Sequence, residues 1–293
     1  MNRSGKMSMR ARHVLEGYSF ISLWVIGFLL FLAVPFGQSL YYSFNQMQLT
    51  NQGLVANYHG IEYYRQAFTL DVEFVPKLMS TVTTMVIHVP LIIVFAMFSA
   101  LLLNRPFRGR TVFRSIFFLP VIIASGMVLQ KLLEQGAATL PIFVQYDLAR
   151  ILSQYVPGEV LLPLLRMADS LTLVMWDSGV QILIFLAGLQ SISPSLYEAA
   201  KCDGATPWES FWKVTFPMIT PMILVNILFS IVNSFTKVNN SVMEYINTVA
   251  FKENNYGYGA ALGWIYFAII FVMILFVMFL FRRMDNPYTR EGR

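Results

Sequence analysis

A polar stretch, EAAKCDGATPWESFWKVTFPMITP at residues 198–221, lies between two long apolar runs of the chain. Its punctuation predicts two short helices joined by a sharp turn. Ser193-Pro194 is typical of a helix start, because a capping residue precedes a proline at the first helical position. Gly204 predicts the end of this helix, since glycine readily adopts the left-handed conformation found just past a helix end.

The second helix is expected to begin at Thr206-Pro207-Trp208-Glu209, which has the pattern of a capping box. Four residues at helical spacing would share one face, whose large aromatic rings can pack on the ends of the spans: Trp208, Phe211, Trp212 and Thr215. We expect Pro217 to end this helix and Thr220-Pro221 to begin the next apolar span. On geometry alone the pattern favours an ordinary capped loop between spans, and the alternative is a projecting element that docks on a partner.

The composition is that of a membrane protein. Of the 293 residues, 56% are hydrophobic and 13% are charged, whereas soluble domains contain about 25% charged residues. Crossing a bilayer core takes roughly 20 helical residues. Six runs reach about that length, and they lie near 18–43, 80–104, 113–133, 171–191, 221–241 and 258–281. The expected fold class is therefore an all-α membrane protein with six transmembrane helices.

The basic residues predict that both termini are cytoplasmic. Fourteen of the 21 Lys and Arg residues lie in the two tails, in the turn at 105–114 and in the polar loop, and such residues collect on the cytoplasmic side. The expected organisation is a tail at 1–17, a transmembrane domain at 18–281 with a cytoplasmic loop at 192–220, and a tail at 282–293. The net charge of +5 therefore needs no nucleic-acid partner.

Other interpretations of the spans were weighed. The first run follows basic residues as a signal peptide does, but its length and the lack of a small-residue cleavage site favour an uncleaved span. The outer segment 44–79 is rich in aromatic residues. The outer segment 134–170 is amphipathic, so we expect it to lie at the membrane interface. A re-entrant pair at 140–168, giving eight spans, is the alternative.

The polar stretch closely resembles the EAA motif of binding-protein-dependent ABC importer permeases. That motif reads E-A-A, three residues, G, nine residues, an aliphatic residue and P. The matching positions are Glu198, Ala199, Ala200, Asp203, Gly204, Ala205, Phe211, Pro217 and Pro221. Three further stretches resemble the carbohydrate-type branch of this family, and they read ALLLNRPFRGRTVFRSIFFLPVIIASGMV, LAGLQSISPSLYEAAKCDGA and NYGYGAAL.

The resemblance implies the type I importer permease fold in an inner, or plasma, membrane of the bacterial type. In such importers the EAA helix docks in a cleft of an ATPase, and closure of two ATPases moves two permeases between inward and outward access. The residues that would couple to the ATPase are Glu198, Ala199, Ala200, Asp203, Gly204 and Ala205. The implied partners are a second, related permease, two ABC ATPase subunits and an extracytoplasmic solute-binding protein, besides membrane lipids.

The chain itself has no phosphate-binding loop of the form G-x-x-x-x-G-K-[ST], so ATP hydrolysis is expected in a separate subunit. We expect no cofactor and no catalytic or metal site, because no acidic pair, triad or Cys/His cluster stands out. The one cysteine, Cys202, cannot form an internal disulfide. By the resemblance, its position takes a small buried side chain.

Polar residues within the predicted spans mark a candidate substrate path, because polar groups in hydrocarbon are costly. In the fifth span the candidates are spaced four, three and four apart on one face: Asn226, Ser230, Asn233 and Lys237. In the fourth span, Asp177 and Gln181 share a face and Trp176 offers a ring that could stack on a sugar. Hydrogen bonding between helices is the alternative for the first set, and an ion pair with Lys237 or Arg166 is the alternative for Asp177.

In the second span, Thr81, Thr84 and His88 also share a face, and we expect His88 to be a hydrogen-bonded packing residue.

The sequence thus favours a permease subunit of an ATP-driven importer of a sugar or oligosaccharide. A permease of the same fold that carries another solute, such as an amino acid, remains the alternative. A membrane-embedded transferase fits less well, because the acidic residues are scattered.

Overall fold

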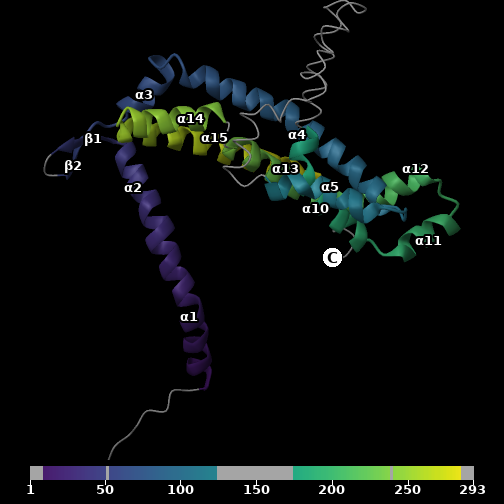
Figure 1. Ribbon diagram of the computed structural model, residues 1–293. Helices are drawn as coiled ribbons and strands as arrows, with labels where there is room; N and C mark the ends of the chain where they lie inside the picture. Colours follow the sequence, from purple (N-terminus) through teal and green to yellow (C-terminus); the bar gives the residue numbers. More distant parts are fainter. Residues whose placement is uncertain (1–8, 51–52, 124–173, 238–239, 285–293) are drawn as a thin grey trace, which may run out of the picture. The chain divides into compact units, whose positions relative to one another are not determined.

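The structure, a computed structural model, describes residues 9–50, 53–123, 174–237 and 240–284. These residues belong to two compact units. The first unit joins Met1–Val75 to Tyr245–Ala268, and the second joins Pro76–Glu244 to Ile269–Arg293. Both consist mainly of helices, in agreement with the predicted class (Figure 1).

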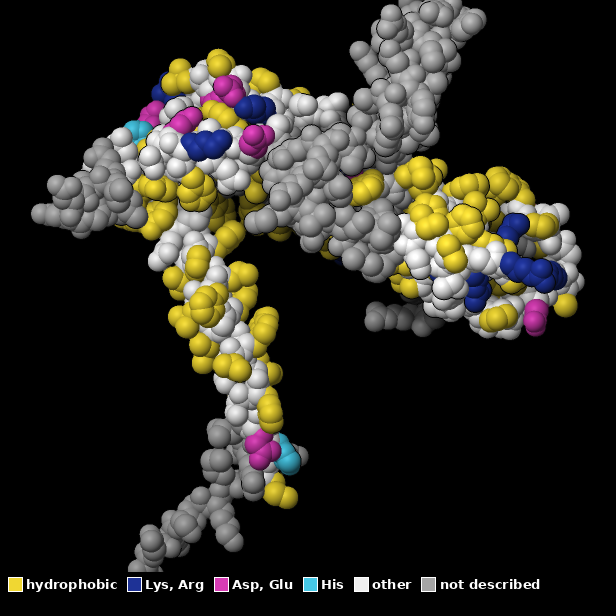
Figure 2. All heavy atoms as spheres, in the orientation of Figure 1, with side chains coloured by type: hydrophobic (Ala, Val, Ile, Leu, Met, Phe, Trp, Pro, Cys, Tyr) yellow, Lys and Arg dark blue, Asp and Glu magenta, His cyan; other side chains and the backbone are white. Residues whose placement is uncertain are grey.

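A long apolar helix begins the first unit. It comprises α1 (Met9–Phe28), the π-helical segment η1 (Leu29–Ala33) and α2 (Val34–Ser43). Its part Glu16–Ser43 is long and apolar enough to cross a membrane, which agrees with the first predicted span. The most apolar window of this helix is not buried within the chain, and Figure 2 shows apolar side chains along its surface. These side chains must therefore meet lipid or another protein chain.

The segment 44–79, predicted to lie on the outer side, contains a β-hairpin that the sequence analysis missed. Strand β1 (Asn45–Thr50) pairs antiparallel with β2 (Gly53–Tyr58), in a register that runs from Asn45 opposite Tyr58 to Thr50 opposite Gly53. Helix α3 (Glu62–Thr69) follows. The strands are only six residues long and contain few β-branched residues, so neither alternation nor propensity indicates them.

Close contact at a glycine anchors this hairpin to the start of α15 (Tyr256–Met284). A Cβ added at Gly257 would lie 2.3 Å from the carbonyl oxygen of Asn45 and 2.7 Å from the ring of Tyr63. The helix backbone can approach the hairpin this closely only because residue 257 has no side chain. Further along α15, the ring of Phe36 packs against Trp264 with centroids 4.5 Å apart.

One carboxylate, that of Asp71, ties three elements of the first unit together. Its Oδ1 accepts hydrogen bonds from the backbone N–H groups of Glu73 (2.9 Å) and Phe74 (2.8 Å), where α4 (Phe74–Asn104) begins. Its Oδ2 accepts from the hydroxyls of Tyr245, 2.8 Å away, and Tyr258. Burial alone would raise the pKa of Asp71, but these four hydrogen bonds outweigh it and hold the pKa below its ordinary value.

We therefore expect Asp71→Asn to lower the free energy of unfolding by roughly 1–2 kcal/mol at neutral pH, because hydrogen bonds to a charged acceptor are the stronger ones. A carboxyl with a lowered pKa stabilises the fold above its unfolded-state pKa of about 3.9 and loses this effect as the pH falls through the folded-state value. The difference in the free energy of unfolding between wild type and variant should therefore shrink on acidification. Thermal unfolding of both proteins in detergent at several pH values measures it. A difference that stays constant with pH would contradict this assignment, and Asp203→Asn, at an exposed aspartate, is the control.

The second unit is built from long helices. They include α4, α5 (Arg110–Ile123), α10 (Gly179–Ser191) and α13 (Phe216–Thr236).

Within the described residues, four helices are long and apolar enough to span a membrane: Glu16–Ser43, Phe74–Asn104, Pro207–Thr236 and Tyr256–Arg282. A fifth is counted if α10 and α11 (Pro194–Cys202), which bend by 63°, form one span. The predicted spans 113–133 and 171–191, and the interfacial helix near 134–170, extend partly or wholly outside the described residues.

The fifth predicted span, 221–241, has different limits in the structure. The helix runs without a break from Pro207 to Thr236, so Pro217 does not end one helix and Pro221 does not begin another. The π-helical segment η2 (Phe211–Thr215) explains this, because it ends with the N–H of Phe216 bonded to the carbonyl of Phe211. Pro217, which has no N–H, therefore stands where the hydrogen-bond register changes from π to α.

Helices α10 and α13 pack closely in the core of the second unit. The buried side chains of Ile182 and Phe185 on α10, and of Ile219 and Ile223 on α13, form this layer. A Cβ added at Gly188 would lie 2.6 Å from Cγ of Met222, so the glycine allows the Met222 side chain to rest against the α10 backbone. This packing aligns the polar residues of the two helices described below.

Candidate functional site

The turn between α11 and α12 (Pro207–Ser210) has the predicted geometry. Gly204 has a φ of +77°, in the left-handed region. Its N–H donates to the carbonyl of Lys201 (3.0 Å), and the N–H of Ala205 donates to the carbonyl of Ala200 (2.9 Å). These two bonds make a Schellman motif, a helix end that requires a residue able to adopt positive φ. The prediction that Gly204 stops the helix is therefore confirmed.

The predicted capping box at the start of α12 is also confirmed. The hydroxyl of Thr206 accepts from the N–H of Glu209 (3.3 Å), and the carboxylate of Glu209 accepts from the N–H of Thr206 (2.9 Å). Farther back, the hydroxyls of Tyr197 and Thr215 are 2.9 Å apart and join α11 to η2. The turn is thus held at its two helix ends and across its base.

The residues expected to couple to an ATPase lie on an open surface. Glu198, Ala199, Asp203 and Gly204 are exposed, whereas Ala200 and Ala205 are half-buried. Lys and Arg side chains gather at the end of this unit that carries α11 and α12 (Figures 1 and 2). The turn therefore presents small and charged groups outward.

One expectation about this loop was wrong, and another holds for only part of the face. Cys202 is exposed, because α11 buries none of its side chains within the chain. The predicted face is half covered, since Thr215 is buried and Phe211 half-buried, whereas Trp208 is 69% and Trp212 46% exposed. The two rings contact each other, with centroids 5.6 Å apart, and Trp212 also packs on Phe211 at 5.0 Å. The cluster continues to Phe216 at the start of α13, whose ring centroid is 5.0 Å from that of Trp212.

A polar cavity of about 210 Å³ lies among α4, α10 and α13. Its described lining includes most of the residues that the sequence analysis singled out: Thr81, Thr84, His88, Asp177, Gln181, Ser230, Asn233 and Lys237. Apolar wall comes from Val89 and Ile92. The structure thus brings the three predicted polar faces together around one space.

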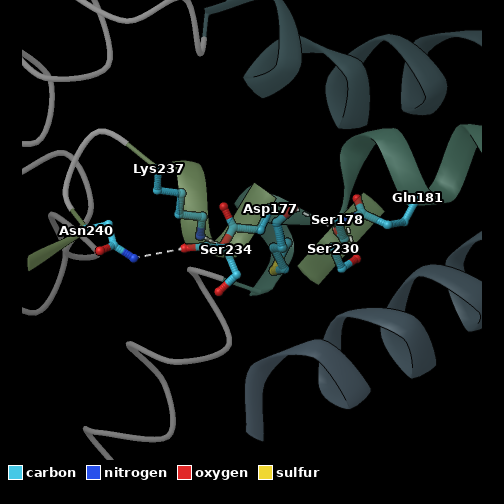
Figure 3. Close-up of polar contacts among 8 residues, drawn as sticks. Asp177, Ser178, Gln181, Ser230, Ser234, Lys237 and Asn240 are labelled. Carbon is cyan, nitrogen blue, oxygen red and sulfur yellow. Dashed lines mark hydrogen bonds and ion pairs between the residues drawn. The ribbon is translucent and has the colours of Figure 1, made fainter. Parts of the chain in front are cut away.

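An ion pair lies in the lining of this cavity. The ammonium of Lys237 donates a hydrogen bond to the carboxylate of Asp177, as Figure 3 shows. Of the two partners that the sequence allowed for Asp177, Lys237 is therefore in place, and the other, Arg166, lies outside the described residues. Lys237 follows the last residue of α13, and Asp177 comes shortly before α10, so the pair joins the ends of two packed helices.

Deeper in the cavity, Gln181 and Ser230 are both buried. The side-chain amide of Gln181 donates to the hydroxyl of Ser230 at 2.8 Å, so α10 and α13 are bonded here too (Figure 3). The carbonyl oxygen of Gln181 is buried and has no hydrogen-bond partner among the described residues. A buried acceptor without a partner is costly, so this oxygen is suited to accept from a water molecule or from a hydroxyl that enters the cavity.

Two predicted path residues do not reach the cavity. Asn226 is buried one turn beyond Ser230, is absent from the described lining, and finds no partner for either amide atom within the described part of the chain. Trp176 is half-buried beside Asp177, and its indole N–H also lacks a described partner. Helical spacing placed Asn226 on the correct face of α13 but could not show that the cavity ends before it.

The cavity also uses residues that the sequence analysis missed. Ser80 lies four residues before Thr84 and eight before His88, so extending that stripe by one turn would have found it. Ser241 also lines the cavity. It was missed because the fifth span was expected to continue to 241, whereas Asn240 caps a new helix, α14 (Ser241–Asn247), by accepting from the N–H groups of Val242 and Met243.

Comparison with solved structures supports the fold. A chain of a bacterial alginate ABC transporter, solved in complex with an alginate pentasaccharide-bound periplasmic protein, matches with a TM-score of 0.63 and 19% identity. The match covers 96% of this chain and 98% of that chain. At this level of identity the likeness establishes the fold alone.

Similar sequences are named as permeases. The chain is 31% identical over 283 residues to the probable ABC transporter permease protein YesP of Bacillus subtilis, covering 89% of this chain and 88% of YesP. It is 27% identical to the arabinooligosaccharides transport system permease protein AraP of Halalkalibacterium halodurans, covering 90% and 86%. It is 29% identical to the multiple sugar-binding transport system permease protein MsmF of Streptococcus mutans, covering 89% and 94%.

The family of binding-protein-dependent transport system inner membrane components matches residues 72–287. This range contains the whole EAA loop and every residue that lines the polar cavity. The chain therefore belongs to the family of binding-protein-dependent transport system inner membrane components.

Proposed function

We propose that this chain is a transmembrane permease subunit of an ATP-driven importer for a sugar or oligosaccharide. The observation that carries the proposal is the cavity between α4, α10 and α13, whose lining is rich in hydroxyl and amide side chains. The chain that contains this cavity belongs to a transport family. Hydroxyl-rich solutes need such donors and acceptors. The names of AraP and MsmF, which refer to arabinooligosaccharides and multiple sugars, support the same substrate class.

The complete importer would contain further subunits. We expect a second, related permease, two ABC ATPase subunits on the cytoplasmic side and an extracytoplasmic solute-binding protein. Purification of the intact complex, followed by a glycan screen of the associated binding protein and uptake of the bound sugars into cells, tests the function directly. Binding and uptake of amino acids, with no sugar carried, would replace the sugar proposal with that of another solute.

The chain is expected to cross the plasma membrane six times with both termini in the cytoplasm. The exposed Cys202 is a natural probe of this orientation. It should resist an impermeant thiol reagent in intact cells and react once the cells are permeabilised. In a Cys202→Ala background, Asn57→Cys should react from outside and Arg108→Cys should not, because the basic turn at 105–114 belongs to the cytoplasmic side. Labelling of position 108 in intact cells would invert the topology.

The polar face of α13 is proposed to touch the substrate as it passes. Asn233 lines the cavity beside Lys237 and is half-buried, so its amide is available to a sugar hydroxyl. Asn233→Leu should lower the uptake rate severalfold without reducing assembly, since leucine is similar in size but forms no hydrogen bond. The rate is measured with labelled sugar and the assembly by copurification of the ATPase.

Two results would contradict this role of Asn233. Loss of assembly would show that the residue holds helices together, and normal uptake with normal assembly would show that this face is not the path. Val232→Leu is the matched control, because Val232 neighbours Asn233 on the same helix but is exposed and does not line the cavity.

A further inference from the structure

We infer that Lys237 makes the path selective for sugars that carry an anionic substituent, such as a carboxylate or a sulfate ester. The inference rests on the proposed function, since it assumes that sugars pass through the cavity. It concerns the charge of the solute, which the hydroxyl and amide lining does not determine. Those neutral groups serve a neutral ring and an acidic ring equally well.

The charged groups at the cavity are few. Among its described lining residues, Lys237 and Asp177 are the charged side chains, and His88 is the third that can titrate. The two members of the ion pair are not equally accessible, because the Lys237 side chain is 39% exposed and that of Asp177 only 13%. The cation is therefore the member that an entering solute meets, whereas the carboxylate lies on the covered side of the pair.

Lys237 also retains hydrogen-bonding capacity. An ammonium has three N–H donors, and among the described residues Asp177 accepts from it. Asn240 is committed elsewhere, since its Nδ2 donates to the carbonyl of Ser234 (3.3 Å) and its Oδ1 caps α14. The remaining donors of Lys237, together with the amide of Asn233 and nearby hydroxyls, suit an oxyanion that arrives from the open side.

A charge-assisted hydrogen bond is roughly twice as strong as a neutral one. The ammonium of Lys237 makes such a bond with any acceptor, but an anionic substituent adds a charge–charge attraction that a neutral hydroxyl lacks. A cationic amino sugar meets the ammonium first and is disfavoured. The ion pair with Asp177 keeps the cavity neutral when it is empty, so the lysine does not stand uncompensated in a membrane helix bundle.

The test uses the intact importer in cells, with three series of short galactose oligosaccharides that differ only at C6: neutral, oxidised to the uronate, and 6-sulfated. The double variant Lys237→Gln with Asp177→Asn removes both charges and keeps side chains that can bond to each other. We expect the ratio of anionic to neutral uptake to fall about tenfold relative to wild type, whatever the double variant does to the neutral rate itself. Since the binding protein and ATPases are unchanged, a change in this ratio belongs to the permease.

A second variant tests whether the position of the cation, and not merely the presence of an ion pair, determines the selectivity. Exchanging the charges, with Asp177→Lys and Lys237→Asp, keeps an ion pair but moves the cation to the covered side. The complex should assemble, and the ratio of anionic to neutral uptake should stay as low as in the double neutral variant. Recovery of anionic uptake in this exchange would overturn the inference, because the position of the cation would then not matter.

The remaining outcomes are also decisive. Preference for the uronate alone, or for the sulfate alone, identifies the anionic group. If wild type shows no preference between the anionic and neutral series, or if a screen shows another, neutral sugar to be the solute, Lys237 is not a selectivity residue but the proposed function stands. If the intact importer carries no sugar at all, the proposed function fails first, and the inference fails with it.

Discussion

Gly204→Val should reduce sugar uptake to background while the protein stays in the membrane. The left-handed conformation at φ +77° strains a β-branched residue by about 1–2 kcal/mol, and relief of that strain breaks the two hydrogen bonds that end α11. The exposed acidic and small residues would then leave the arrangement in which they are proposed to meet an ATPase. Uptake of labelled sugar and copurification of the ATPase measure the effect.

Gly204→Asn is the matched control, because asparagine tolerates the left-handed conformation better than other side chains. It should retain a substantial part of the uptake. Glu198→Lys, which reverses an exposed charge on α11 without disturbing the turn, should weaken ATPase association on its own. Normal uptake and normal association in both Gly204→Val and Glu198→Lys would remove the coupling role of this loop.

Gly257→Ala should destabilise the first unit by roughly 2–3 kcal/mol, because one added methyl group would collide with a backbone oxygen that cannot move independently. The hairpin carbonyl of Asn45 would lie 2.3 Å from the new atom. The expected result is a lower midpoint of thermal unfolding and less protein in the membrane. Both are measured on the purified complex and on membranes from the same cells.

The same substitution elsewhere on α15 should act in the opposite direction. Gly263 has nothing within 4 Å of an added Cβ, so Gly263→Ala should be neutral or should stabilise the helix by up to about 1 kcal/mol. A common effect of the two substitutions would show that helix propensity, and not the contact with the hairpin, determines the result at Gly257.

Local signals in the sequence predicted local structure well. Gly204 and the capping box at Thr206 and Glu209 depend on hydrogen bonds within a few residues, and both appear as expected. The apolar runs predicted long helices for a similar reason, since length and hydropathy are properties of a single segment. The polar faces of α4 and α13 followed from helical periodicity, which places residues on a face without reference to the rest of the chain.

Features that depend on distant residues were missed. The approach of Gly257 to Asn45 joins segments about 200 residues apart in the sequence, and no local pattern records it. The burial of Asn226 depends on where the cavity ends, and the exposure of Cys202 depends on whether a layer covers α11. Pro217 was wrongly expected to end a helix. A proline can stand where a π-helical turn changes the hydrogen-bond register, and the position of such a turn depends on the whole helix.

The continuity of the helix from Pro207 to Thr236 has a mechanical consequence. Thirty residues at 1.5 Å each make a rod of about 45 Å, which starts at the capping box and ends beside Lys237. A tilt of only about 5° over that length moves the far end by roughly 4 Å, enough to separate an ammonium from its carboxylate. A displacement of the turn near Gly204 that tilts this helix would therefore be amplified along its length. A small change of angle at the turn would separate Lys237 from Asp177 at the other end.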